Sequence, residues 1–136
     1  MNFKFLEHTA DVKFQAFGKT LEEAFVNSVL AMFNAMHDGK IESKKSFKIK
    51  VKGKDFESLL YNFLEELLFL FDVEGFFLSN VKSIKIDRKK FKLEAVVFGD
   101  DVLKYKMHLG IKAITYNDMF VKKVKGKWVA QVVLDV

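Results

Sequence analysis

The chain opens on Phe3-Lys4-Phe5-Leu6-Glu7-His8-Thr9-Ala10-Asp11-Val12-Lys13-Phe14-Gln15-Ala16-Phe17, where two apolar-alternating runs flank a polar connection. Alternation with a period of two predicts two half-buried strands. The connection lacks the Gly, Asn or Pro that usually forms a tight turn, so turn chemistry alone does not explain its three ionisable residues. It is either an ordinary polar loop or a functional one.

Length and composition fit one domain. The chain has 136 residues, and half of them are hydrophobic, including 16 Phe, so a substantial core can form. The absence of Cys excludes disulfides and zinc–thiolate sites and is compatible with a cytoplasmic protein. We expect no targeting segment, because the sequence begins directly with a strand-like pattern. We also expect no membrane contact, because the longest apolar run, residues 67–71, is far shorter than the ~20 residues of a membrane span.

The net charge of +5 raises the question of nucleic-acid binding. Arg88 is the only Arg among the 23 basic residues. Direct recognition of phosphates and bases relies strongly on the planar guanidinium group of Arg. A surface made almost entirely basic by Lys is therefore weak evidence for RNA binding.

Two helices are predicted. Thr20 and Glu23 form a capping box at the start of the first helix, and Gly39 is a plausible stop. Asp55 can cap a second helix that continues to about Phe71. Apolar residues cover more than one stripe of this second helix, so we expect it to be buried on two sides.

The rest of the chain is strand-like. Alternating apolar residues predict six further strands, at residues 47–51, 84–86, 91–97, 111–116, 119–124 and 128–135. The resulting pattern predicts the α+β class: a two-layer arrangement with a mixed, mainly antiparallel sheet and two helices packed on it.

Common catalytic motifs are missing from the sequence. There is neither a phosphate-binding Gly loop nor a Gly-x-Ser-x-Gly elbow, and the three His lack metal-ligand spacing. His37 is expected to act as a dipole partner at a helix end, and His108 is given no role. His8, in the first loop, is the His of functional interest.

Oxygen ligands meet in one predicted site. If the last strand stays in the sheet to its end, Asp135 and the α-carboxylate of Val136 are held close together. With Asp11 from the first loop, they would suit Mg²⁺, Ca²⁺ or Mn²⁺. Lys112 lies in an apolar stretch, where it is either an outward-facing residue of a half-exposed sheet or a functional amine.

Four motifs together resemble the archease family over the whole chain and in the right order. They are residues 7–12, residues 60–70, Lys112-Ala113-Ile114-Thr115-Tyr116 and the closing Leu134-Asp135-Val136. Lys13 stands where relatives often have a smaller residue, and Asn117 stands where His is common. The resemblance implies a single archease-like domain over residues 1–136, with a two-layer α+β fold.

The resemblance further implies a non-catalytic activator of the RtcB-type RNA ligase, which joins tRNA halves after intron removal. Such activators promote guanylylation of the ligase, permit multiple turnover and broaden its nucleotide use. The family's metal site corresponds to Asp11, Asp135 and Val136, with His8 and Lys112 as candidate supporting residues. The ligase is the expected partner, tRNA is a possible indirect one, and whether RNA contacts this chain directly stays open.

Two alternatives remain open. One is a small divalent-metal-dependent phosphohydrolase or nuclease that uses the same two Asp, although only His8 could serve as its general base. The other is an RNA-binding chaperone that acts through the Lys-bearing strands. Turnover of a phosphodiester by the purified protein would favour the first, and salt-sensitive RNA binding without the ligase would favour the second.

Overall fold

The structure is a computed structural model that describes residues 1–7 and 11–136. The described residues form two α-helices, one short 3₁₀ helix and seven strands. In chain order these are β1 (Phe3–Leu6), β2 (Val12–Gly18), α1 (Leu21–Met36), β3 (Lys45–Lys52), α2 (Phe56–Glu74), β4 (Phe76–Asp87), β5 (Lys92–Asp101), η1 (Val102–Lys104), β6 (Ala113–Val124) and β7 (Lys127–Asp135).

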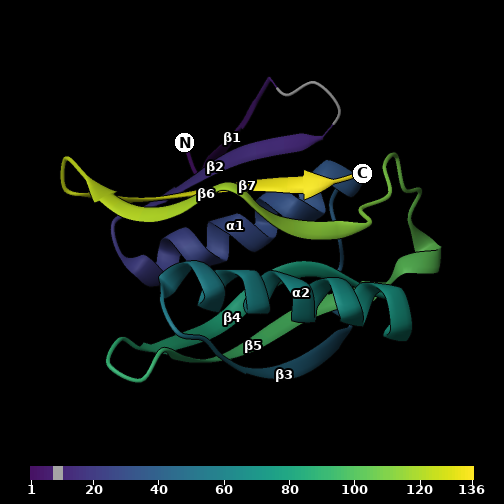
Figure 1. The fold of residues 1–136 in the computed structure, drawn as a ribbon. Helices are drawn as coiled ribbons and strands as arrows, with labels where there is room; N and C mark the ends of the chain where they lie inside the picture. Colours follow the sequence, from purple (N-terminus) through teal and green to yellow (C-terminus); the bar gives the residue numbers. More distant parts are fainter. Residues whose placement is uncertain (8–10) are drawn as a thin grey trace.

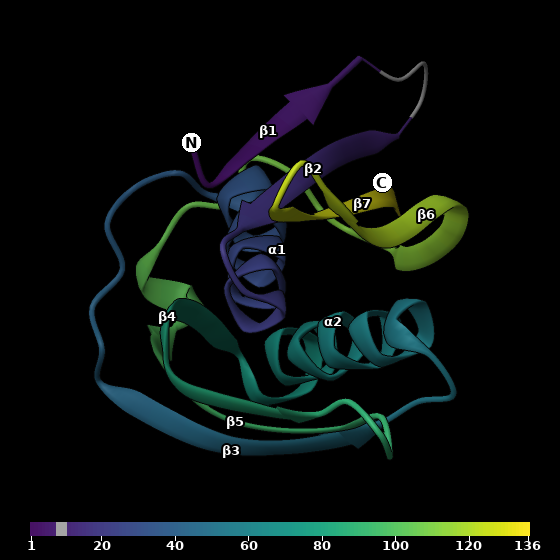
Figure 2. The ribbon, with the colours of Figure 1, turned by 90° about the vertical axis from the view of Figure 1, so that its left-hand side faces the viewer.

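The strands form two antiparallel sheets. A four-stranded sheet has the order β1-β2-β7-β6, and a three-stranded sheet has the order β3-β5-β4. Figures 1 and 2 show both helices lying between the two sheets. The α+β class and the mainly antiparallel pairing are thus confirmed. The expected single sheet is divided into two because α1 and α2 separate β1, β2, β6 and β7 from β3, β4 and β5.

Local sequence fixes the helix ends. The hydroxyl of Thr20 accepts a hydrogen bond from the Glu23 amide at 3.1 Å, as the capping-box signal predicts. Asp55 and Ser58 form the corresponding box at the start of α2. Gly75 ends α2 in the left-handed conformation (φ 62°), which Gly adopts at little cost. The first helix ends at Met36, before the predicted stop at Gly39.

The core lies on both sides of α2. This helix contacts β6 of the four-stranded sheet and β3 and β4 of the three-stranded sheet, which confirms its predicted two-sided burial. Phe25 of α1 and Phe63 of α2 stack with ring centroids 6.5 Å apart and are fully buried. Each such side chain contributes about 2–3 kcal/mol by leaving water. None of the described helices is both long and apolar enough to cross a membrane.

One strand starts well before its predicted position, and two predicted strands merge into one. β4 begins at Phe76 instead of residue 84, because Phe76, Phe77 and Leu78 are all buried and so show no alternation. β6 runs through the predicted break after Tyr116, where an irregularity in its pairing with β7 separates Thr115 from Phe120.

Gly99 of β5 is a position where added volume should be costly. A Cβ atom there would meet the carbonyl oxygen of Phe77 and the ring of Phe76 below ordinary contact distances. We expect Gly99→Ala to lower the free energy of unfolding by about 1–3 kcal/mol, measured by urea denaturation. Gly110→Ala is the matched control, because a Cβ at Gly110 meets nothing within 4 Å. Equal stability of the two variants would contradict this packing.

Candidate functional site

One end of the four-stranded sheet brings together the predicted metal ligands. The last pair between β2 and β7 is Val12 with Leu134, so continuing the antiparallel register by one residue places Asp11 beside Asp135. On the other side of β7, Asp135 pairs with Ala113 of β6. The amide of Lys112 extends this pairing by donating to the carbonyl oxygen of Asp135 at 2.8 Å. Figure 1 shows the C-terminus at this end of the sheet.

The chain end is part of the packed structure. Val136 is partly buried and packs against the core, and Leu134 is fully buried. Asp135 is exposed and Asp11 is partly buried. The sheet pairing therefore holds the backbone of residues 134 and 135 in place, while the Asp135 side chain stays open to solvent.

Lys112 differs from the expectation of a Lys inside an apolar strand. It lies one residue before β6, and its side chain is exposed. Its backbone is nevertheless fixed at the site by the hydrogen bond to Asp135. The ammonium group can thus approach an anion at this end of the sheet without the cost of burying a charge.

A groove of about 930 Å³ lies beside Asp11. Glu7, Asp38 and Lys13 also line it, so its wall carries three acidic side chains and one basic side chain. The Lys13 ammonium group lies 3.6 Å from the Asp118 carboxylate.

The donor chemistry of this site fits a hard divalent ion. Asp11, Asp135 and a terminal carboxylate at Val136 would supply oxygen ligands only, which suits Ca²⁺, Mg²⁺ or Mn²⁺. In residues 1–7 and 11–136, no three or more His, Cys, Asp or Glu side chains gather as a metal-binding group. A divalent ion at the two Asp would need further oxygen ligands to complete its coordination shell. The prediction for His8 falls outside the described residues.

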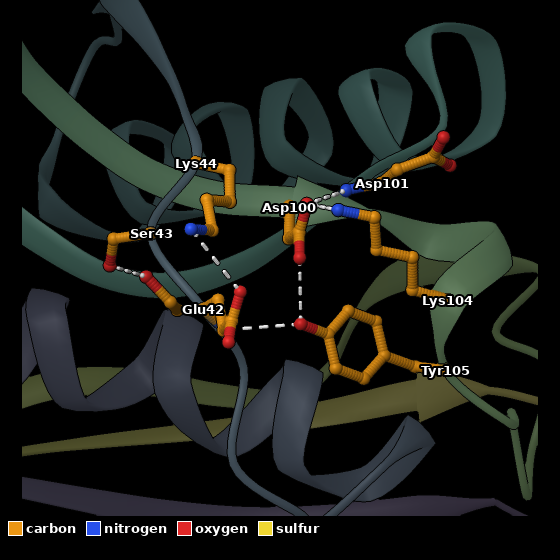
Figure 3. Close-up of polar contacts among 8 residues, drawn as sticks. Glu42, Ser43, Lys44, Asp100, Asp101, Lys104 and Tyr105 are labelled. Atoms are coloured by element: carbon orange, nitrogen blue, oxygen red, sulfur yellow. Dashed lines mark hydrogen bonds and ion pairs between the residues drawn. The ribbon is translucent and has the colours of Figure 1, made fainter.

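A second polar cluster surrounds the buried carboxylate of Asp100 (Figure 3). The Tyr105 hydroxyl donates to Asp100 Oδ2 at 2.8 Å, and the Lys104 ammonium group donates to Oδ1 at 3.2 Å. The Asp101 amide also donates to Oδ1, at 2.8 Å. The Tyr105 oxygen accepts from the Glu42 amide at 3.0 Å. These contacts fasten the segment after β5 to the loop before β3, so we interpret the cluster as structural.

Sequence analysis did not identify this cluster or the His pair next to it. His37 and His108 stack in parallel with ring centroids 5.6 Å apart, and His37 Nδ1 lies 2.7 Å from the carbonyl oxygen of Lys106. The contact forms because the segment after η1 returns past the end of α1, where the His108 amide donates to the Met36 carbonyl. No local sequence pattern predicts a contact between residues so far apart in the chain.

The hydrogen bonds to Asp100 predict how stability depends on pH. Burial alone would raise the pKa of Asp100, but the hydrogen bonds from Tyr105, the Asp101 amide and Lys104 together lower it. The charged form therefore stabilises the fold at neutral pH, and this stabilisation is lost as the pH falls below about 4. We expect Asp100→Asn to be less stable than wild type at pH 7 and the difference to shrink by pH 3.

Urea denaturation across this pH range measures the effect. Asp72→Asn removes an exposed acid of α2 and is the matched control, which should follow the wild-type protein throughout. A constant difference between Asp100→Asn and wild type from pH 7 to pH 3 would show that the charge of Asp100 does not stabilise the fold.

The chain is similar to known proteins in both sequence and fold. Residues 3–136 match the model of the Archease protein family (MTH1598/TM1083). The chain is 44% identical to the protein archease of Pyrococcus furiosus, over 96% of this chain and 95% of that protein. It is 39% identical to the protein archease of Methanosarcina acetivorans, over 98% and 95% respectively.

Two solved structures share the fold of this chain. The solution structure of Methanobacterium thermoautotrophicum protein 1598 matches with a TM-score of 0.85 and 34% identity, over 99% of both chains. An archease of Thermotoga maritima, described as a possible chaperone, shares the fold with a TM-score of 0.63 and 17% identity, over 98% of this chain and 96% of that one.

The molecule is thus a small α+β protein in which two helices lie between two antiparallel sheets, with two Asp adjacent at one sheet end. The chain belongs to the archease family.

Proposed function

We propose that this member of the archease family is a non-catalytic accessory factor of the RtcB-type tRNA-splicing RNA ligase, acting in the cytoplasm. It promotes guanylylation of the ligase, sustains multiple turnover and broadens the nucleotides that the ligase accepts. The acidic end of the four-stranded sheet, with Asp11, Asp135 and Val136, is the part that acts on the ligase.

One observation carries this proposal: the register of β2, β7 and β6 gathers Asp11, Asp135 and the Lys112 amide at one sheet end. Residues from three separate regions of the chain converge there, and Asp11 also lines the groove described above. A rigid sheet holds carboxylates more accurately than a free loop does, which is what positioning a metal ion or a phosphate requires.

Each residue has a role in the proposal. Asp11 and Asp135 hold a divalent ion, and the α-carboxylate of Val136 adds a third oxygen ligand where this residue ends the chain. The ion supplies positive charge that offsets the charge of a nucleotide phosphate. Lys112 contacts the same phosphate or orients the carboxylates, and His8 supports the site from the first loop. The chain needs no general base of its own, because the ligase performs the chemistry.

A multiple-turnover ligation assay tests the proposal. The RtcB-type ligase is mixed with a large excess of tRNA halves, GTP and a divalent ion, with and without this protein. We expect joined RNA to exceed the ligase concentration only when the protein is present. Joining that stays at one product per ligase in both reactions would contradict the activator role.

The same preparation, incubated without ligase on RNA and on a generic phosphodiester, tests the enzyme alternative. No cleavage is expected, and cleavage that requires Asp11 would replace the activator by a metal-dependent phosphohydrolase.

A further inference from the structure

Six lysines gather on the outer face of the three-stranded sheet, the face turned away from the helices. They are Lys48, Lys50 and Lys52 of β3, Lys82 and Lys85 of β4, and Lys92 of β5. We call this set the lysine face. All six side chains are exposed.

Strand alternation explains why these lysines point outward together. Ile49 and Leu93 are buried in the core, so the alternate residues of β3 and β5 lie on the opposite face. The register then aligns the residues across the sheet: Lys50 pairs with Glu94 and Lys52 with Lys92. Lys85 pairs with Glu94 from the other side. Lysines from three strands thus form one continuous surface.

The positive charge of this surface is only partly neutralised. Among the described residues of these strands, Glu94 and Asp87 are the acidic residues on the lysine face. The Lys50 ammonium group lies 3.5 Å from the Glu94 carboxylate. Asp87 already accepts hydrogen bonds from the amides of Lys89 and Lys90 in the adjoining turn. The face therefore keeps a clear excess of positive charge.

The shape and spacing of the lysine face suit an extended polyanion. Hollows of about 580 and 420 Å³ lie between its lysines. Alternate residues of one strand are spaced about 7 Å apart, so Lys48, Lys50 and Lys52 form a regular row. A row of exposed ammonium groups can follow the phosphates of a nucleic-acid strand without reading its bases.

We propose that the lysine face binds the phosphate backbone of RNA directly. A membrane is the less suitable occupant, since the apolar members of the face, Val96 and Phe98, are partly buried. The Lys82 ammonium group also lies 5.5 Å from the centroid of the Phe98 ring. The choice of RNA over DNA rests on the proposed function, whereas polyanion binding itself does not.

The lysine face lies away from the acidic end of the four-stranded sheet. Figure 1 shows β3, β4 and β5 on the far side of the helices from the C-terminal end of β7. RNA on the lysine face would leave Asp11 and Asp135 accessible to the ligase. The contact with tRNA would then be direct, a point that the sequence leaves open.

Fluorescence anisotropy with a labelled stem–loop RNA, without ligase and in EDTA, tests this inference. The triple variant Lys48→Gln, Lys52→Gln, Lys85→Gln should bind at least ~10-fold more weakly than wild type at ~100 mM salt, with a salt-dependence slope reduced by about 2. The control variant Lys106→Gln, Lys123→Gln, Lys127→Gln loses the same charge from exposed positions elsewhere. Its affinity should stay within roughly twofold of wild type.

Glu94→Gln provides a test of opposite sign. Because Glu94 lies between Lys50 and Lys85 in the register, removing its charge should tighten RNA binding by about two- to threefold. Equal affinities of the two triple variants would overturn the inference. Phosphatidylserine vesicles that compete with the RNA as effectively as unlabelled RNA would also overturn it.

Ligase activation separates this inference from the proposed function. The lysine-face triple variant should raise guanylylation of the ligase as wild type does, since it retains Asp11 and Asp135. Full RNA binding by the variant together with normal activation would refute only the lysine face. Absence of activation by the wild-type protein, with RNA binding lost in the variant, would refute only the activator role.

Discussion

Asp11→Asn is expected to weaken divalent-ion binding by about 10- to 100-fold and to abolish ligase activation, with the fold unchanged. Asn keeps the shape of the side chain and removes the charge that the proposed metal site needs. Asp11 lies just before β2 and is only partly buried, so the substitution leaves the core intact. Calorimetric titration with Mn²⁺ and with Ca²⁺ measures the affinity.

The matched control is Asp118→Asn. Asp118 is an exposed acid of the same sheet and forms an ion pair with Lys13 at 3.6 Å. Its backbone is in the left-handed region (φ 54°), which Asn tolerates well. The control should bind metal as wild type does. Wild-type affinity in Asp11→Asn would show that Asp11 belongs to an ordinary polar connection.

An extension at the C-terminus is expected to have an effect of similar size. A residue added after Val136 turns the proposed terminal carboxylate into a neutral amide and crowds Asp135. Melting without metal should be unchanged, because an added residue leaves the buried Leu134 and the partly buried Val136 in place. The rise in melting temperature that divalent ions give the wild type, by binding only the folded state, should be lost.

An extension before Met1 is the control. Phe3 pairs with Ala16, so the N-terminus lies at the other end of β2 from Asp11. Deleting Asp135 and Val136 should act like the C-terminal extension, only more strongly, because two oxygen groups are lost. A C-terminally extended protein that gains full metal stabilisation and activates the ligase would show that the terminus is not a ligand.

Local signals in the sequence were sufficient for some elements and insufficient for others. The capping residues Thr20 and Asp55 placed the helix starts correctly, because a cap depends on residues within one turn. The start of β4 was missed because Phe76 and Phe77 are both buried, so the strand lacks the alternation of a half-exposed one. The division into two sheets depends on how the helices pack, which no single segment encodes.

The sequence identified residues of the candidate sites but could not show which of them are neighbours. Sequence reasoning selected Asp11 and Asp135, and the register of β2 with β7 makes them neighbours. Their role as metal ligands stays a prediction. The alternation of β3 was recognised, but the alignment of its lysines with Lys85 and Lys92 follows from strand pairing that the sequence does not reveal. The positive charge of the chain supports the proposal of RNA binding only because the fold gathers six lysines on one face of a sheet.

Single-turnover guanylylation of the RtcB-type ligase tests the central claim most directly. Ligase is mixed with labelled GTP and a divalent ion, alone, with equimolar wild-type protein or with equimolar Asp11→Asn. We predict that the wild-type protein raises the rate of guanylylation at least ~10-fold, about 1.4 kcal/mol of activation free energy, while the variant leaves the rate of ligase alone unchanged. A rate that equimolar wild-type protein does not change would contradict the claim.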